Sequence, residues 1–144
     1  MDMEMRIKIL ENAYIGSLVD AIYNFTKQGV LNKVTEEKRK IQMITGKKRA
    51  EQFGITKPED VFKRLSDIFN CAFWELEYCN DGFEANSKSC KLCTYAKKMG
   101  TEAPCNMYCL HPMEGMIKGI DPKLKFKVSE TLWEGEKCKV KVSR

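Results

Sequence analysis

The sequence lacks the features that mark exported, membrane-spanning or disordered proteins. No apolar run approaches the roughly 18 residues that a membrane span requires. The first six residues, Met-Asp-Met-Glu-Met-Arg, carry charges where a secretory signal needs an apolar core. We find no internal repeat, low-complexity tract or long linker. We therefore expect a cytoplasmic protein with no membrane segment.

Cysteine is absent from the first 70 residues, and the chain has a single histidine. The seven cysteines all follow, whereas a secreted disulfide scaffold would spread its bridges over the chain. With 144 residues, of which 43% are hydrophobic, the chain has enough length for one ordinary domain and its core. We expect a single domain over 1–144, with N-terminal helices in 1–56 and a cysteine-rich α+β part in 57–144.

The first half has helical periodicity. Apolar residues recur at three- and four-residue steps from Leu10 to Phe25, and Gly29 follows the run. A second helix is predicted from Thr35 to Phe53, with Gly46 as a weak point inside it. The motif Thr56-Lys57-Pro58-Glu59 resembles a capping box and predicts a third helix.

The second half changes to the alternation that is typical of strands. Residues 73–78 and 83–87 flank an Asn-Asp-Gly turn and predict one hairpin, and residues 124–128 and 138–142 predict another. Helices are expected over 90–99 and 105–117. The sequence thus predicts an α+β fold with a helical N-terminal half and an antiparallel sheet of two hairpins that is packed against helices on one face.

Four cysteines form two closely spaced pairs, Cys90 with Cys93 and Cys105 with Cys109. Residues three or four apart on a helix share a face, so each pair can present two thiolates to one ion. Four thiolates suit zinc or an iron–sulfur cluster equally well. Plain packing of buried thiols is the first alternative. A redox pair of Cys90 and Cys93 is the second.

Two further residues could take part in chemistry. His111 lies two positions after Cys109 and is a candidate general base or metal ligand, although a lone histidine is more often ordinary. Parity places Cys138 on the buried face of its strand, where it could act as a nucleophile or ligand or only pack. Cys71 and Cys79 receive no role.

The methionines and aromatics of this half could line an apolar ligand pocket, as an alternative to simple core packing. The residues concerned are Tyr95, Met107, Tyr108, Met113, Met116 and Trp133.

The positive charge is concentrated in residues 33–49, which contain seven basic and two acidic residues. Such a helix could bind nucleic acid, but a solvated helix face is the more ordinary interpretation, and the segment lacks interleaved aromatics. We regard nucleic-acid binding as the least favoured alternative.

The apolar stripe from Leu10 to Phe25 could form a homodimer interface instead of packing in the core of its own chain.

The C-terminal half resembles the 2-aminothiazoline-4-carboxylate hydrolase-like family. The likeness rests on Cys90 at a helix start, Gly100 at its end, Cys109 in the next helix and the hairpin 132–138, and it covers about residues 57–144. That family is similar to 4-vinyl-reductase-type small-ligand-binding domains, which also end in a cysteine-bearing hairpin and can bind zinc.

This resemblance implies a hydrolase that acts on a C–N or C–S bond of a small cyclic substrate. By the same resemblance, Cys109 and Cys138 would be the reactive thiols and His111 the proton carrier. The alternative that the residues leave open is a metal-containing module that binds or senses a small ligand without catalysis.

Overall fold

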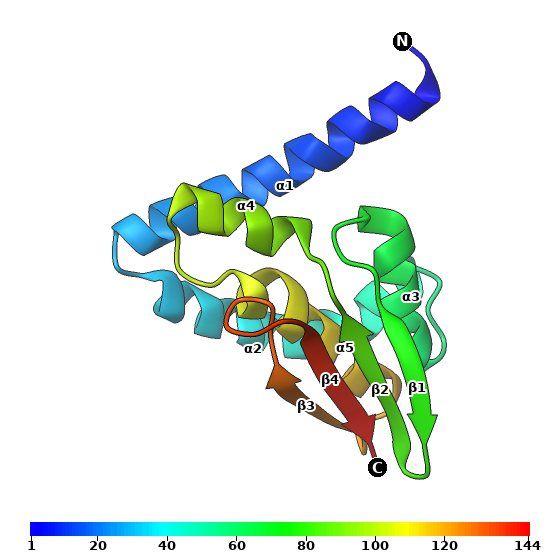
Figure 1. Ribbon diagram of the computed structural model, residues 1–144. Coiled ribbons are helices and arrows are strands. Elements are labelled where there is room, and N and C mark those ends of the chain that lie inside the picture. Colours follow the sequence, from blue (N-terminus) through cyan, green and yellow to red (C-terminus); the bar gives the residue numbers. More distant parts are fainter.

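Five α-helices, one π-helical turn and four strands make up the fold (Figure 1). The computed structural model describes residues 1–144. In chain order the elements are α1 (Met3–Lys27), α2 (Leu31–Gln52), α3 (Pro58–Phe69), β1 (Glu75–Cys79), β2 (Gly82–Ser87), α4 (Lys91–Met99), the π-turn η1 (Asn106–Leu110), α5 (His111–Ile120), β3 (Lys125–Glu130) and β4 (Cys138–Ser143).

One predicted helix start is wrong, and one predicted capping motif does not form. Helix α2 begins at Leu31, directly after a turn in which Gly29 takes a left-handed φ of 69°. Thr35 therefore lies inside the helix, where its hydroxyl donates to the Leu31 carbonyl at 2.7 Å. Helix α3 has Lys57 as its N-cap, with no side-chain capping bond. Its start relies on Pro58, whose fixed φ suits the first helical position, so Thr56 does not form the predicted capping box.

The two hairpins join into one antiparallel sheet with the strand order β1-β2-β4-β3. Strands β2 and β4 form its centre, with Phe83 opposite Val142 and Ala85 opposite Val140. Cys138, Val140 and Val142 are all buried, as the alternation predicts. The opposite face carries charged side chains, including a Glu84–Lys139 ion pair.

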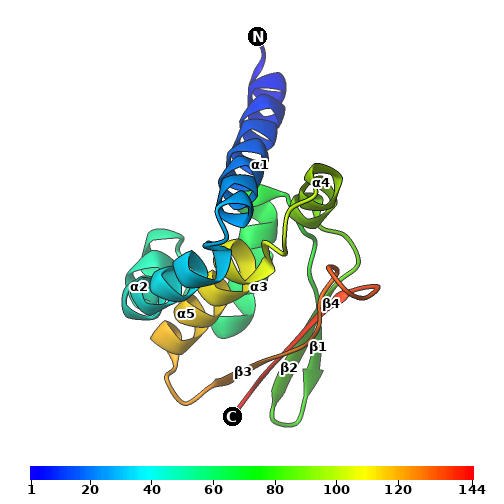
Figure 2. The same cartoon turned by 90° about the vertical axis from the view of Figure 1, so that its left-hand side faces the viewer.

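Helices cover one face of the sheet, and the core lies between the two layers (Figure 2). Phe62 of α3 and Met113, Met116 and Ile117 of α5 are buried in the same cluster as the inward side chains of β2 and β4. The predicted α+β fold is therefore confirmed. Phe62 also makes edge-to-face contacts with Trp74 and Phe83, which tie the helical layer to the first hairpin.

Helices α2 and α5 pack backbone against backbone. A Cβ at Gly46 would overlap the carbonyl oxygen of Gly115, and a Cβ at Gly115 would overlap that of Gln42. Gly119 meets the backbone of Lys47 in the same way. Gly46 is therefore the point of closest helix contact, and the helix-weakening residue of the sequence prediction is required there for packing.

Helix α1 extends beyond the rest of the molecule (Figures 1 and 2). Its second half packs on the body, where Ile15 and Val19 contact Leu92 of α4, and Ile22 contacts Leu31 and Met107. Residues 1–10 are all exposed. None of the helices combines the length and the hydropathy that a membrane crossing would need.

Candidate active site

A cavity of about 320 Å³ lies among α1, α2, α3 and the helical segment formed by η1 and α5. Most of its wall is apolar, with contributions from Tyr14, Phe69 and Trp74. Three cysteines, Cys71, Cys90 and Cys109, also line it. An apolar cavity with a few polar or reactive groups is the usual form of a small-molecule site.

Two short backbone contacts bring Cys71 and Cys90 to the same wall. Helix α3 ends at Phe69, and the left-handed φ of 51° at its C-cap, Asn70, turns the chain sharply just before Cys71. The Lys91 amide then donates to the Cys71 carbonyl at 2.7 Å, beside an isolated bridge between Ala72 and Cys90. Cys90 is the N-cap of α4 and accepts the Cys93 amide on its sulfur at 3.4 Å.

Cys109 lies in the π-turn, and Pro112 explains why that turn forms there. In η1 the His111 amide donates to Asn106, five residues back, instead of four. The next acceptor in this register, the Met107 carbonyl, would need the amide of residue 112, which proline lacks. The side-chain amide of Gln42 donates to that carbonyl instead, at 3.1 Å. Single π-turns of this kind are frequent at functional sites.

The cavity thiols are protonated at neutral pH in this structure. Burial raises the pKa of Cys71 and, strongly, that of Cys109. The side-chain hydrogen bond with the Cys93 thiol, together with burial, raises the pKa of Cys90 far above its ordinary value and outweighs the lowering effect of the Cys93 amide. A thiol must lose its proton before it can attack an electrophile, so thiol chemistry at this wall needs a proton acceptor.

The remaining thiols of the prediction lie behind this wall, in the core. The sulfurs of Cys93 and Cys105 are 3.5 Å apart, and their hydrogen bond, partly offset by that to Cys90, raises the pKa of Cys93 to about 12. Cys138 is buried and accepts the Leu132 amide on its sulfur at 3.3 Å. Neither Cys93, Cys105 nor Cys138 lines the cavity.

The four thiols of the metal prediction are brought near one another but do not converge on one point. No set of three or more His, Cys, Asp or Glu side chains has an arrangement that could hold a metal ion. Cys109 lies on the cavity wall, while Cys93 and Cys105 face each other in the core. The structure therefore gives no support to a zinc or iron–sulfur site at these four thiols, and the metal site stays a prediction.

The charges that act on His111 come from α2 and α5. Burial lowers its pKa, and the nearby Arg39 charge lowers it further, whereas Glu114 and Glu36 oppose the shift. Its Nδ1 atom is buried without a hydrogen-bond partner. No cysteine acts on its pKa, and His111 does not line the cavity.

Helix α2 supplies the polar part of the cavity wall. The four residues concerned are Lys38, Gln42, Thr45 and Arg49. Their three- and four-residue spacing places them along one stripe of the helix. Neither Lys38 nor Arg49 forms an ion pair with an acidic residue. The stripe therefore offers hydrogen-bonding groups and uncompensated positive charge opposite the thiols.

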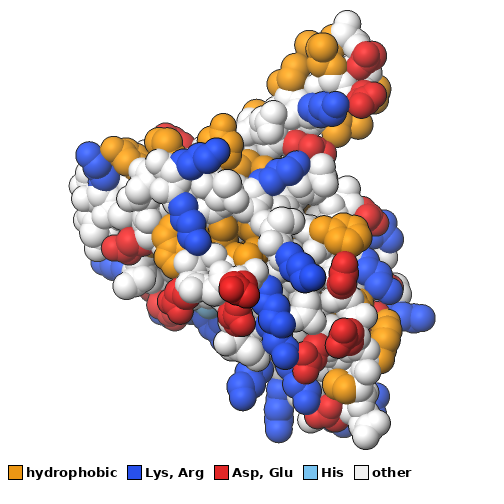
Figure 3. Space-filling model, viewed as in Figure 1, with side chains coloured by type: hydrophobic (Ala, Val, Ile, Leu, Met, Phe, Trp, Pro, Cys, Tyr) orange, Lys and Arg blue, Asp and Glu red, His pale blue; other side chains and the backbone are white.

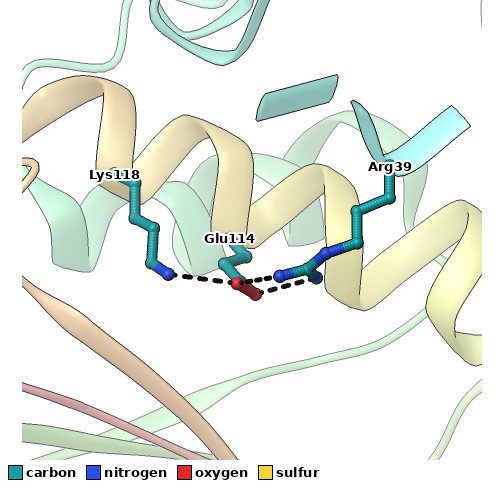
Figure 4. A network of polar contacts seen from close by, with 3 residues as sticks. All are labelled: Arg39, Glu114 and Lys118. Carbon is teal, nitrogen blue, oxygen red and sulfur yellow. Dashed lines mark hydrogen bonds and ion pairs between the residues drawn. The ribbon is translucent and has the colours of Figure 1, made fainter. Parts of the chain in front are cut away.

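The rest of the basic segment is partly engaged within the chain. Arg39 forms a two-pronged hydrogen bond with Glu114, at 2.8 and 3.3 Å, and Lys118 adds a third contact at 3.3 Å (Figure 4). Lys40 pairs with Glu37 on the same helix. The segment thus serves helix packing and the cavity wall in addition to the solvated face that its composition predicts.

Sequence patterns alone missed Cys71, Tyr14 and the α2 stripe. Cys71 stands alone, with no partner at chelating distance along the chain, and Tyr14 has the spacing of an ordinary core residue. The stripe follows the helical period, 38, 42, 45 and 49, but lies among other charges that hide it. The stripe can be recognised only in the structure, where its polar side chains interrupt the apolar wall of the cavity.

A family model for L-2-amino-thiazoline-4-carboxylic acid hydrolases matches residues 6–141. The match extends through the helical half, well beyond the region of the resemblance seen in the sequence. No curated protein and no solved structure shows significant similarity to the chain. The matched region contains all the residues that line the cavity. The chain belongs to the L-2-amino-thiazoline-4-carboxylic acid hydrolase family.

Proposed function

We propose that this protein hydrolyses a small ring that contains sulfur and nitrogen, of the aminothiazoline carboxylate type, inside the cavity. The observation that carries the proposal is the Cys109 thiol on the cavity wall in a chain of this family. The cavity volume of about 320 Å³ suits a five-membered ring with small substituents.

The chemistry requires a proton acceptor, and such a substrate brings its own. Burial keeps Cys109 protonated, and the basic ring nitrogen of an aminothiazoline can take that proton. The sulfur then forms a bond to the ring carbon between sulfur and nitrogen, and either the C–S or the C–N bond of the ring breaks. Water attacks the same carbon and releases the Cys109 thiol. The net reaction adds one water to the substrate.

The test is a mass measurement on the unlabelled substrate. We expect L-2-amino-thiazoline-4-carboxylate to gain the mass of one water in the presence of the protein, and Cys109→Ser to lower kcat by roughly 100-fold or more. Cys79 is exposed and remote from the cavity, so Cys79→Ser is the matched control and should keep full activity. Full activity of Cys109→Ser would overturn the assignment of the nucleophile.

The roles that the resemblance gives to Cys138 and His111 are separate proposals. Neither lines the cavity, so we expect Cys138→Ser and His111→Gln to affect activity less than Cys109→Ser. A loss from either substitution that equals the loss from Cys109→Ser would place that residue in the reaction.

The second candidate function is small-ligand binding without catalysis. The observation that favours it is that Cys71 and Cys109 are half-buried thiols with raised pKa values, which suits an unreactive binding wall as well as a nucleophile that is not yet ionised. Binding of the ring without any gain of water would establish this alternative.

The metal prediction has its own measurement. Anaerobic purification, a visible absorption spectrum and a metal analysis distinguish zinc, an iron–sulfur cluster and a metal-free protein. A stoichiometric metal that Cys93→Ser removes and Cys79→Ser retains would support the four-thiol site. A metal-free active protein would refute it.

A further inference from the structure

We propose that Gln42 and Lys38 form a recognition pair on α2, in which Gln42 accepts a hydrogen bond from the amino group of the ligand and Lys38 pairs with its carboxylate. This inference rests on the proposed function for the ring chemistry and adds the groups that select and orient the ring. The ligand class is a small heterocyclic carboxylate that carries an N–H donor.

The first observation is an unused acceptor on a residue that lines the cavity. The Oε1 atom of Gln42 is buried and has no hydrogen-bond partner, although Gln42 lines the cavity. Buried carbonyl groups almost always have a partner, so an exception at a cavity indicates a partner that the ligand supplies. The amino group of an aminothiazoline is a donor of the required kind.

The second observation is that the orientation of this amide is fixed. Its nitrogen donates to the Met107 carbonyl, which Pro112 leaves without a backbone donor in the π-turn. A flipped amide would set two oxygens against each other, so Oε1 must be the free atom. The backbone of Gln42 is also fixed, because its carbonyl lies against Gly115 at the helix crossing.

The third observation places this acceptor near the thiol. The bond to Met107 ties the Gln42 side chain to the same π-turn that carries Cys109, two residues further on. An amino group that is bound to Gln42 is attached directly to the ring carbon that the thiol must attack. Binding at Gln42 would therefore hold that carbon next to the reactive wall.

The charge at the same end of the cavity comes from Lys38. It precedes Gln42 by one helical turn, and its ammonium group lies 5.6 Å from the centre of the Tyr108 ring, in the π-turn. Arg49 is eleven residues from Lys38, or about 16 Å along the helix, so one small ring cannot contact both. With no acidic partner of its own, Lys38 is available to a ligand carboxylate.

The experiment measures binding by calorimetry in the Cys109→Ser protein, so that turnover does not interfere. The two probes are L-2-amino-thiazoline-4-carboxylate and thiazoline-4-carboxylate, which lacks the amino group. We expect the amino probe to bind roughly tenfold more tightly. Gln42→Met should remove this difference, while Lys38→Met should weaken both probes about equally. The controls are Gln52→Met and Lys48→Met, which change exposed residues of α2 outside the cavity.

A second measurement covers the case in which Gln42→Met does not fold. In NMR spectra of the Cys109→Ser protein, the side-chain amide signals of Gln42 should shift more on binding of L-2-amino-thiazoline-4-carboxylate than on binding of thiazoline-4-carboxylate. Equal shifts, or a preference for the amino probe that survives in Gln42→Met, would overturn the inference. Failure of hydrolysis leaves these binding results unaffected, so it would remove the proposed function alone.

Discussion

Glu114 is the one acidic side chain buried in this molecule, with 7% of its surface exposed. Burial alone would raise its pKa, but the hydrogen bonds and charges of Arg39 and Lys118 outweigh that effect and lower it. A carboxyl with a lowered pKa in the folded state stabilises the fold above its unfolded pKa, and this contribution is lost as the pH falls through the folded value.

We therefore expect Glu114→Gln to lower the free energy of unfolding by about 1–3 kcal/mol at pH 7, because Arg39 loses a charged partner. This loss of unfolding free energy should become smaller when the pH is lowered below the ordinary pKa of a glutamate, because the carboxyl is then increasingly protonated. Urea denaturation at pH 7 and at pH 3.5 measures both effects. Glu51→Gln, at an exposed position of α2 without an ion pair, is the control. A loss independent of pH would show that the carboxyl charge does not stabilise the fold.

The thiols should react in an order set by burial. Cys79 is exposed, whereas burial raises the pKa of Cys109 and slows its ionisation. With iodoacetamide at pH 7, we expect alkylation of Cys79 first and of Cys109 much later, and the Cys109 rate should rise by up to about tenfold per pH unit below its pKa. Peptide mass spectrometry follows each site. Early, pH-independent alkylation of Cys109 would contradict the burial of this thiol.

At the scale of elements, the crossing of α2 and α5 depends on three glycines. Alanine at Gly115 would place a methyl group against the Gln42 backbone, which a side-chain rotation cannot relieve. We expect Gly115→Ala to lower the free energy of unfolding by roughly 1–3 kcal/mol. Gly16 in α1 has nothing within 4 Å of an added Cβ, so Gly16→Ala should instead stabilise by about 0.5–1 kcal/mol. Chemical denaturation measures the change in unfolding free energy for both variants. A change of the same sign in both would contradict the close crossing of α2 and α5.

The periodic elements could be predicted from the sequence because local patterning determines them. The alternation in 138–142 faces Cys138, Val140 and Val142 inward, as observed, and the two hairpins form as expected. The helix caps were harder to predict, because a helix can also start at a glycine turn or at a proline, without a side-chain cap. Thr35 resembles a cap but follows a turn at Gly29 that already starts the helix, and Pro58 starts α3 without help from Thr56.

The candidate site was predictable only where thiols share a short segment. The spacing of Cys90, Cys93, Cys105 and Cys109 brings them into one region, and Cys93 contacts Cys105 as two folded-back segments should. The cavity itself joins α1, α2, α3 and η1, whose contacts span most of the chain. The position of Gln42 in its polar stripe depends on the glycine crossing and on Pro112 in the π-turn. Neither effect has a local sequence pattern of the kind that defines a helix or strand.

At the scale of the whole molecule, the projecting start of α1 is an unusual surface. Apolar side chains gather along it (Figure 3), and several large ones are exposed, among them Met3, Ile7 and Leu10. A shallow groove between Ile7, Leu10, Tyr14 and the end of α3 lies beside them. Most of the predicted pairing stripe, which runs from Leu10 to Phe25, is used within the chain, because Ile15, Val19 and Ile22 are buried. We therefore expect that a homodimer, if it forms, uses the exposed N-terminal half of α1 and not the buried part of the predicted stripe.

Two copies that bury this exposed half of α1 against each other would remove a contiguous apolar surface of the kind that monomers rarely expose. We expect a dimer by sedimentation or light scattering at micromolar concentration, and a monomer after Ile7→Glu combined with Leu10→Glu, since each charge would have to enter the interface without a partner. Ile44→Glu is the matched control, because Ile44 is 82% exposed on α2, away from this surface. Both substituted proteins should keep the ligand affinity of the parent, because neither Ile7 nor Leu10 lines the cavity. A monomeric parent protein, or a dimer that the double substitution leaves intact, would contradict pairing through α1.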